Sequence, residues 1–264
     1  MTDPSAPRVR VAVGEMPPDL RAGTPEWDDL AERLAATQAD LVVLNELPFG
    51  PWLPSSDDFD QGAFDAAVEA HDQAIERLGE LGVPNVVGSR LTVQDGRRVN
   101  AGFVWRRGQG VEDVYTKQHV PNSMGYYEQA WYEPGPRDFP LFEVAGLTVG
   151  MLICTDVMFN EHARHYGRAG AQLIAVPRAM PPVTAGFFDA ALTMAAVASG
   201  AYVASSNRGG FNDQGEAFEG RGAVYNPAGQ HVAQTNMLSP IDYCDLDLGM
   251  VAIKQALYPC DVPE

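Results

Sequence analysis

The hydrophobic pattern in the first half of the chain alternates between short apolar runs and longer segments with one apolar face. Residues 9–13 and 41–44 are short aliphatic runs, which are typical of buried strands. Between them, Trp27, Leu30 and Leu34 recur at the spacing of a helix face. We therefore expect a strand, a helix and a second strand in this order.

The start of that helix carries a signal of its own. Thr24 is a good N-cap, and Pro25 suits the first helical position because its missing N–H would have no partner there. A second helix is expected over residues 64–78, where apolar side chains again repeat at helical spacing. Two further helices are expected at about 161–169 and at 187–199.

Strand pairs dominate the second half of the chain. A hairpin is expected from residues 139–144 and 148–153, turning at Ala145–Gly146. Residues 115–121 are ambiguous, and residues 122–136 are expected to form a long structured loop because they are rich in Tyr, Trp, Gly and Pro. The other expected strands are 86–89, 101–105, 173–176, 202–206, 223–225 and 241–246.

This mixture of elements predicts an α/β protein with two sheets covered by helices. The 264 residues are enough for one large core. We expect a single domain over residues 1–264, with residues 1–7 as a flexible start and residues 248–264 as a C-terminal extension.

Composition narrows the range of partners. The formal charge of −17 argues against binding to nucleic acid or to anionic lipid. The sequence shows no apolar run of membrane-spanning length, and its first residues lack the pattern of a secretory signal. We therefore expect a cytoplasmic protein that binds neither a membrane nor nucleic acid.

The cysteines and histidines give no metal-binding pattern. Cys154, Cys244 and Cys260 are odd in number and include no Cys-x-x-Cys pair, so free thiols are expected and zinc is not. His162 and His165 are three residues apart on one expected helix face, but no third ligand is near in the sequence. No cofactor or metal is expected.

Three polar residues follow expected strands or stand at a strand–loop edge. These residues are Glu46, Lys117 and Cys154, and Lys117 is one of only two lysines in the chain. Ligand sites in α/β sheets collect at the carboxyl ends of strands, so the three side chains are candidates for one crevice. Each taken alone also fits a structural or solvated role.

The sequence around these three residues resembles the nitrilase superfamily, also called the carbon–nitrogen hydrolases. Members carry a Glu–Lys–Cys triad in this chain order. The motifs are Asn-Glu46-Leu-Pro, Tyr-Thr-Lys117-Gln-His-Val-Pro and Leu-Ile-Cys154-Thr-Asp-Val-Met-Phe-Asn-Glu. Residues 202–210 and 218–229 also resemble the closing strands of the family, so the resemblance covers about residues 8–247.

The resemblance implies a four-layer α-β-β-α sandwich and a role for each residue of the triad. Cys154 would be the nucleophile, Glu46 the base that accepts and returns its proton, and Lys117 the cation that stabilises the oxyanion. The backbone N–H of Thr155 would be the second oxyanion donor. Family members often carry a further glutamate after the lysine. Glu128 is our candidate for it, and Glu133 is the alternative.

The sequence motifs say less about the identity of the substrate than about the reaction. The family often has an aromatic residue directly after the cysteine and an arginine four positions on, where this chain has Thr155 and Met158. The missing arginine weakens the case for an N-carbamoyl amino acid. Arg178, in Val-Pro-Arg178-Ala179-Met, either takes the place of the missing arginine or forms a structural ion pair.

Aromatic residues are further candidates for contact with a substrate. Trp52, Tyr127 and Trp131, together with Arg178 and Ala179, are the expected substrate-binding residues. The aromatic side chains fit the packing core of a long loop equally well.

The expected function is hydrolysis of a small linear amide by an amidase or carbamoylase, through a thioester and with release of ammonia. Cys-Thr-Asp differs from the Cys-Trp-Glu of nitrilases, which favours an amide over a nitrile. An N-acyltransferase and a catalytically silent scaffold are the alternatives. The family resemblance also implies a homodimer or a higher homo-oligomer.

Overall fold

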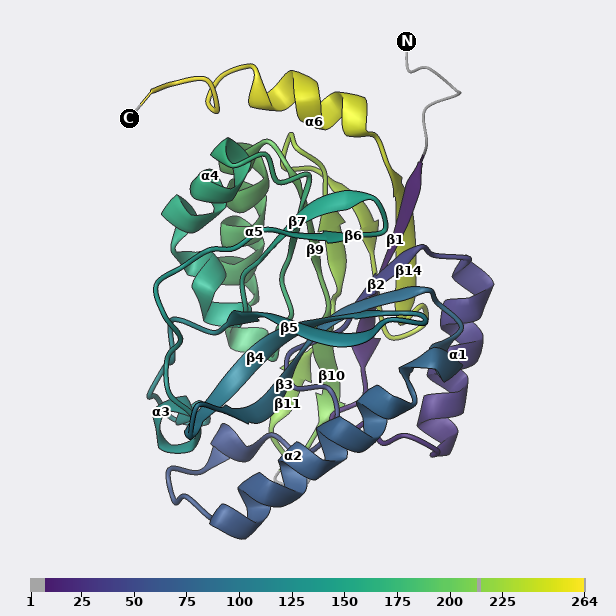
Figure 1. The fold of residues 1–264 in the computed structure, drawn as a ribbon, viewed down its shortest axis with the longest axis vertical. Coiled ribbons are helices and arrows are strands. Elements are labelled where there is room, and N and C mark those ends of the chain that lie inside the picture. The colour runs from purple at the N-terminus through teal and green to yellow at the C-terminus, as the bar shows by residue number, and fades with distance from the viewer. Residues whose placement is uncertain (1–7, 213–214, 264) are drawn as a thin grey trace.

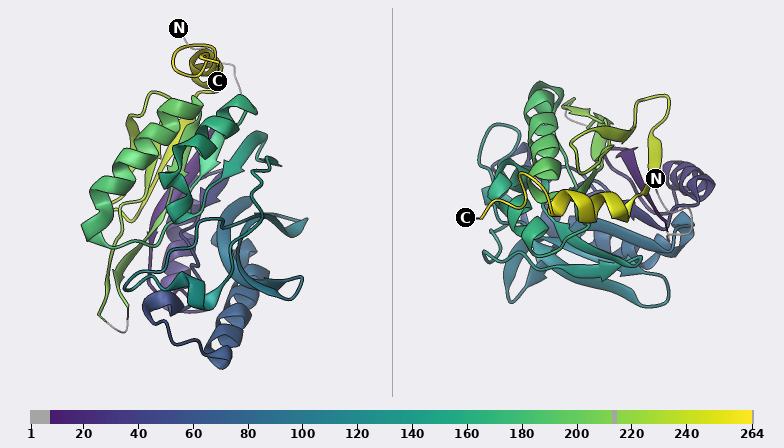
Figure 2. Two further views of the ribbon diagram at one scale, coloured as in Figure 1. Left: turned by 90° about the vertical axis from the view of Figure 1, so that its left-hand side faces the viewer. Right: turned by 90° about the horizontal axis from the view of Figure 1, so that it is seen from above.

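The computed structural model describes residues 8–212 and 215–263. The expected flexible start, residues 1–7, lies outside the described residues. Two β-sheets pack face to face in the centre of the molecule, and helices cover their outer faces (Figure 1). In Figure 2, α4 and α5 lie on one side of the paired sheets and α2 on the other. The expected α/β class and α-β-β-α layering are confirmed.

The first sheet has eight strands in the described part of the chain. Their order is β11-β10-β1-β2-β3-β4-β5, and β14 also pairs with β1. β1, β2 and β3 run parallel, and β3, β4 and β5 form an antiparallel meander. The strands are β1 (Val9–Met16), β2 (Leu41–Val43), β3 (Asn85–Gln94), β4 (Arg97–Arg106), β5 (Gly110–Thr116), β10 (Asn207–Phe211), β11 (Ala217–Glu219) and β14 (Ile241–Leu246).

The second sheet has six strands among the described residues, in the order β13-β12-β9-β8-β7-β6. β7, β8 and β9 run parallel, so the ends of these strands lie at one edge. The strands are β6 (Phe142–Val144), β7 (Leu147–Met151), β8 (Leu173–Ala175), β9 (Tyr202–Ser205), β12 (Ala223–Tyr225) and β13 (His231–Gln234).

Six α-helices are present in the described residues. Thr24 caps the first by accepting a hydrogen bond from Trp27 N, and Pro25 opens it, as the sequence predicts. The expected C-terminal extension contains a short helix whose Gln255 donates to the Ala171 carbonyl. The helices are α1 (Pro25–Thr37), α2 (Gln61–Glu76), α3 (Glu128–Trp131), α4 (Asn160–Arg168), α5 (Ala185–Ser199) and α6 (Leu248–Gln255).

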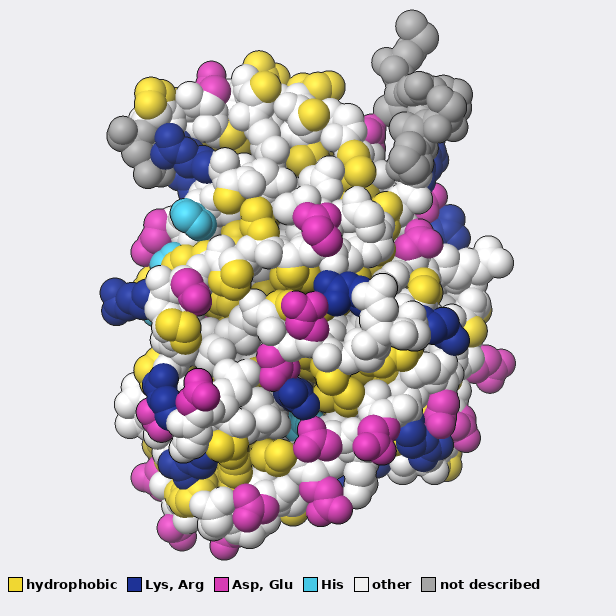
Figure 3. Space-filling model, viewed as in Figure 1, with side chains coloured by type: hydrophobic (Ala, Val, Ile, Leu, Met, Phe, Trp, Pro, Cys, Tyr) yellow, Lys and Arg dark blue, Asp and Glu magenta, His cyan; other side chains and the backbone are white. Residues whose placement is uncertain are grey.

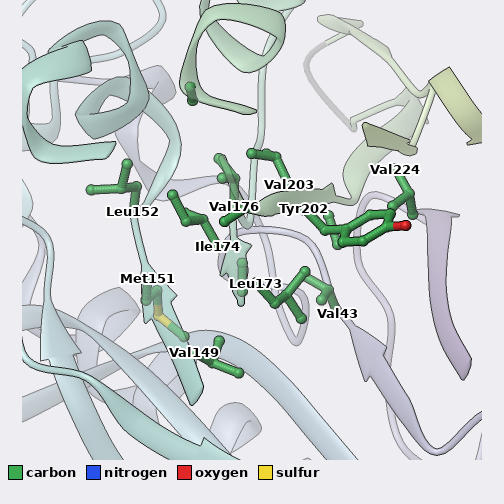
Figure 4. Close-up of a cluster of buried hydrophobic side chains, with 14 of the residues drawn as sticks. Val43, Val149, Met151, Leu152, Leu173, Ile174, Val176, Tyr202, Val203 and Val224 are labelled. Atoms are coloured by element: carbon green, nitrogen blue, oxygen red, sulfur yellow. The ribbon is translucent and has the colours of Figure 1, made fainter. Parts of the chain in front are cut away.

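The first sheet is buried on both faces, which explains the near-continuous apolar runs of its strands. In β1, Val11 and Val13 contribute to the core between the sheets, and Ala12 contributes to the core under α1 and α2. Val43 of β2 lies in the core between the sheets, beside side chains from strands of the second sheet such as Leu173 (Figure 4).

Several local predictions are corrected by the structure. Only Tyr115 and Thr116 of the ambiguous segment 115–121 lie in a strand, where they end β5. The rest of β5 was not predicted, because charged residues on this last strand of the sheet hide the strand pattern. The expected loop at 122–136 contains the single turn of α3. The second hairpin strand ends at Met151, two residues earlier than expected, and a 3₁₀ turn begins at Cys154. The pattern did not predict β10, β11, β13 or α6.

One helical segment of the described chain, residues 182–199, has the length and hydropathy of a membrane span. This corrects the expectation that no such run exists. In the structure 39% of the segment is buried, and Leu192 and Ala195 of α5 belong to the core over the second sheet. Core helices of this kind pass the same test, so the segment is weak support for a membrane role.

Gly167 of α4 offers a test of how closely α4 and α5 pack. A Cβ at this position would overlap the backbone oxygen of Ser199. A backbone atom cannot move away by a simple side-chain rotation. We expect Gly167→Ala to lower the free energy of unfolding by about 2 kcal/mol or more, as overpacking does. Urea denaturation of the purified protein measures this change.

Gly186→Ala is the matched control for this test. A Cβ on Gly186, in the first turn of α5, would meet nothing within 4 Å. Its stability should stay the same or rise, because alanine is the better helix former. Equal stability of the two variants would contradict the predicted close contact.

Candidate active site

Glu46, Lys117 and Cys154 lie just beyond the carboxyl ends of β2, β5 and β7. Lys117 Nζ donates to Glu46 Oε1 at 2.7 Å and to Glu128 Oε2 at 2.6 Å. The side chains of Lys117, Glu46 and Glu128 are fully buried. Two carboxylates therefore surround one ammonium. The structure brings these residues together although Glu46 and Glu128 are 82 positions apart in the sequence.

Glu128 and Glu133 occupy different environments. Glu128 is carried by α3 and reaches the buried Lys117. Glu133 is half exposed and pairs with Arg97 at 2.9 Å on the surface. Of the two candidates for the fourth residue, only Glu128 contacts the lysine in the structure.

Asn100 is part of this cluster, although sequence reasoning missed it. Its side-chain Nδ2 donates to Glu46 Oε1 at 2.9 Å, and its backbone carbonyl accepts from Lys117 N at 2.9 Å. Asn100 is fully buried in the middle of β4. A polar amide between apolar residues of a central strand was the available signal, because a buried amide requires partners.

Cys154 adopts a backbone conformation that is unusual for its residue type. Its φ is 50°, in the left-handed region that costs a non-glycine residue about 1–3 kcal/mol. Its backbone N–H donates to the Pro177 carbonyl at 2.9 Å, which ties the turn to the segment after β8. This conformation directs the chain sharply away from β7 at the residue that carries the thiol.

Electrostatics set the protonation of the cluster. Burial lowers the pKa of Lys117, but the charges of Glu128 and Glu46 outweigh this effect and hold the pKa above its usual range. Burial raises the pKa of Glu128 from its ordinary value to about 8, against the opposing charge of Lys117. Burial and then the Glu46 charge raise the pKa of Cys154, so its resting form is the neutral thiol.

Asp156 links the lysine segment to the cysteine turn. Its Oδ2 accepts from Tyr115 Oη at 2.9 Å and from Ile153 N at 3.1 Å. Its Oδ1 accepts from His119 N at 2.8 Å and lies 2.9 Å from His119 Nδ1. Tyr115 and His119 flank Lys117, and Ile153 precedes Cys154. One fully buried carboxylate therefore joins the segment around Lys117 to the turn that begins at Cys154.

A cavity of about 270 Å³ opens at Cys154. Thr155 and Ala179, two of the residues expected in the site, are among those that line it. The Thr155 N–H has no acceptor among the described residues. The remaining lining residues are Pro121, Ser123, Met124, Tyr126, Cys154, Met180, Pro181, Val183, Thr184 and Phe188.

Four of the expected substrate-binding residues do not line this cavity. Trp52 and Trp131 are buried, and their Nε1 atoms donate to the carbonyls of Gly125 and Ser56 at 3.0 Å and 2.7 Å. Tyr127 precedes α3. Arg178 is buried and lines a different cavity. Trp52 and Trp131 therefore take the packing role that the sequence left open.

No group of three or more His, Cys, Asp or Glu side chains is placed to hold a metal ion among residues 8–212 and 215–263. His162 instead stacks on Phe139, with ring centroids 4.1 Å apart. Acidic and basic side chains are interspersed on the face of the molecule shown in Figure 3.

Comparison with known proteins supports the resemblance seen in the motifs. The sequence model of the family described as carbon–nitrogen hydrolase matches residues 10–253. A protein of Pseudomonas protegens, described as "Hydrolase in pqqF 5'region", is 29% identical over 258 residues, which cover 94% of this chain and 86% of that protein. The predicted family resemblance is confirmed.

Solved structures share the fold. A carbon–nitrogen hydrolase from Helicobacter pylori G27 matches with a TM-score of 0.83 at 20% identity, over 96% of this chain and 94% of that one. An amidase from Nesterenkonia sp. matches with a TM-score of 0.73 at 25% identity, over 92% of each chain.

Replacing Glu128 by Gln should change the pH dependence of stability. The raised pKa of Glu128 means that the folded state binds more protons than the unfolded state between about pH 4.5 and 8. This group therefore makes the free energy of unfolding fall as pH rises, by at most about 1.4 kcal/mol per pH unit. In Glu128→Gln this contribution disappears, and urea denaturation from pH 5 to 9 should show a smaller fall.

Glu133→Gln is the control, because it removes an exposed carboxylate from the same segment. Its pH profile should match that of the unmodified protein. A profile of Glu128→Gln identical to both would show that Glu128 does not bind the extra proton.

Proposed function

This chain belongs to the carbon–nitrogen hydrolase family, and on that premise we propose that it is a cysteine-dependent amidase that releases ammonia from a small amide. The observation that carries the proposal is the buried Lys117 between Glu46 and Glu128, together with the thiol of Cys154 in the wall of a small cavity. A structural ion pair would not require a strained cysteine at a cavity wall.

The first half-reaction begins with transfer of the Cys154 proton to Glu46. Glu46 Oε2 is buried and has no hydrogen-bond partner among the described residues, so it is available to accept a proton. Sγ then attacks the amide carbon, and a C–S bond forms as the carbonyl oxygen becomes an oxyanion. Glu46 returns the proton to the leaving nitrogen, the C–N bond breaks, and ammonia leaves a thioester on Cys154.

Lys117 Nζ and the Thr155 N–H are the proposed oxyanion donors. Lys117 is a cation in a water-poor site, where a charge has a strong effect on a developing anion. The Thr155 N–H has the same proposed role of oxyanion donor, because it follows Cys154 directly and has no acceptor among the described residues. In the second half-reaction Glu46 removes a proton from water, the hydroxide attacks the thioester, and the C–S bond breaks to give the acid and the thiol.

The alternatives share the nucleophile but differ in what they consume. A nitrile would form a thioimidate on the same Sγ, and an acyltransferase would use an amine in place of water. Cys-Thr-Asp favours the amidase over the nitrilase. The buried and complete Glu46–Lys117–Cys154 set argues against a silent scaffold, because an isolated buried charge cluster is costly to maintain.

All three cysteines are free thiols in the structure, which suits a reducing compartment. We accordingly propose a cytoplasmic enzyme that acts on a small molecule and needs no metal or cofactor.

Replacement of the triad tests the proposal. Cys154→Ala and Glu46→Gln should each lower kcat on simple amides by at least about 1,000-fold, since the residues act as one unit. Ammonia release measures turnover, and intact mass detects the acyl group on the protein. Cys260→Ala is the control, because its half-buried thiol lies at the C-terminal end of the chain and should leave both readouts unchanged.

Full activity of Cys154→Ala would refute the proposed function. A nitrile hydrolysed faster than every amide would replace it with nitrilase chemistry, and a dependence on added amine would replace it with acyl transfer.

We further propose that two copies pair through α5. Phe187 and Met194 are seven residues apart on this helix and are 70% and 48% exposed, and Val183 in the turn before it is 84% exposed. Apolar side chains gathered on one helix face are typical of a contact surface.

Phe187→Glu with Met194→Glu should convert a dimer to a monomer in light scattering. Met237→Glu, which changes an exposed apolar residue between β13 and β14, should not. A monomeric unmodified protein would refute the pairing.

A further inference from the structure

The cavity at Cys154 has no charged side chain in its wall among the described residues. Its lining consists of apolar residues, three hydroxyl-bearing residues besides Thr155, and the thiol itself. At about 270 Å³ it is just below the range of about 300–1,000 Å³ that is typical of pockets for drug-sized ligands. A carboxylate or ammonium on the acyl group of a substrate would lose part of its water there without gaining an opposite charge from the wall.

Arg178 precedes Ala179 of the cavity wall in the sequence, but it is not among the residues that line the cavity. Its Nε donates to Ser205 Oγ at 2.7 Å, and one terminal nitrogen donates to the Arg221 carbonyl at 2.9 Å. The other terminal nitrogen lies 3.1 Å from the sulfur of Met180. The guanidinium thus faces a second cavity, which is lined by Asp189, Glu219 and other polar residues.

Met180 and Phe188 form the partition between these two environments. Both side chains line the Cys154 cavity. Both also contact Arg178, whose Cζ lies 5.8 Å from the centroid of the Phe188 ring. Met180 is held in place because its backbone N–H donates to Asn207 Oδ1 at 3.1 Å. An apolar wall two side chains wide therefore keeps a buried cation away from the substrate.

Glu216 is a carboxylate close to the loop that lines one side of the cavity. It approaches Gly125, in the loop that carries Met124 and Tyr126. It is not among the lining residues, and its Oε2 accepts from Asn212 Nδ2 at 2.7 Å. An ammonium group on a substrate would therefore have to reach outside the cavity to meet it.

We propose that this enzyme selects amides with an uncharged, mainly apolar acyl group, and that Met180 and Phe188 determine this specificity by separating Arg178 from the substrate. The inference rests on the proposed amidase function and adds the class of substrate to it. It excludes carboxylated amides and N-carbamoyl amino acids as preferred substrates, and it also excludes amides with a terminal amine.

Three amides of matched length test the inference on the intact protein. They are pentanamide, glutaramate, in which a carboxylate replaces the terminal methyl group, and 4-aminobutanamide, in which an ammonium replaces it. We expect kcat/KM from ammonia release to be at least about 100-fold higher for pentanamide than for either charged amide, because each charge is desolvated without a partner. A charged amide hydrolysed as fast as pentanamide, or faster, overturns the inference and leaves the amidase function intact.

A second measurement does not depend on turnover. Each amide is added in excess while iodoacetamide alkylates Cys154, and intact mass reports the alkylation rate. Pentanamide should slow alkylation and glutaramate should not. Protection by glutaramate alone, or by neither amide, overturns the inference. Protection by pentanamide without ammonia release would instead refute the proposed function and support the selectivity of the cavity.

The Met180→Ala variant tests the partition directly. Removing the side chain opens a path to Arg178, so kcat/KM for glutaramate should rise at least about 10-fold relative to that for pentanamide, because a new partner becomes available to the carboxylate. In the double variant Met180→Ala with Arg178→Met this gain should vanish. The far-ultraviolet circular dichroism of each variant checks that it is folded. An unchanged preference in a folded Met180→Ala protein would show that Met180 does not set the specificity.

Discussion

The interaction on which the rest of the site depends is the buried ammonium of Lys117 between two carboxylates. Glu46 and Glu128 lie 2.7 and 2.6 Å from Nζ, and all three side chains are inaccessible to solvent. Burying a charge costs several kcal/mol unless it is paired and hydrogen-bonded. The residues come from the ends of β2 and β5 and from α3. These elements must therefore keep their relative positions for the chain to tolerate the cluster.

Cys154, the proposed nucleophile, follows a strand of the other sheet, so a second set of contacts must align it with the cluster. Asp156 provides that link, because it accepts hydrogen bonds from both sides of Lys117 and from the residue before Cys154. The left-handed conformation of Cys154 is stabilised by its hydrogen bond to Pro177. Charge is thus concentrated behind the thiol, and the cavity in front of it is neutral. In the proposed mechanism, this separation lets one site combine ionic catalysis with an apolar surface for the substrate.

The accuracy of the sequence predictions varied with the range of the interactions involved. The capping of α1 by Thr24 and Pro25 was predicted because the signals lie within a few residues of each other. Most of β5 was not predicted, because it is the last strand of its sheet and its exposed residues obscure the alternation on which strand prediction relies. The amphipathic pattern also did not show that Trp52 and Trp131 are packing residues. Their partners lie 73 and 75 positions away.

The sequence by itself determined the family and the order of Glu46, Lys117 and Cys154 along the chain. It also placed these three residues near the ends of strands. Short motifs could show this because each consists of residues that are adjacent in the sequence. Only the tertiary structure decided between Glu128 and Glu133, since burial beside Lys117 depends on how the segment around α3 folds back. It also revealed that Arg178, although adjacent in sequence to a residue of the cavity at Cys154, lines a different cavity. The direction of a side chain in a core is set by the segments packed around it, and those segments are distant in the sequence.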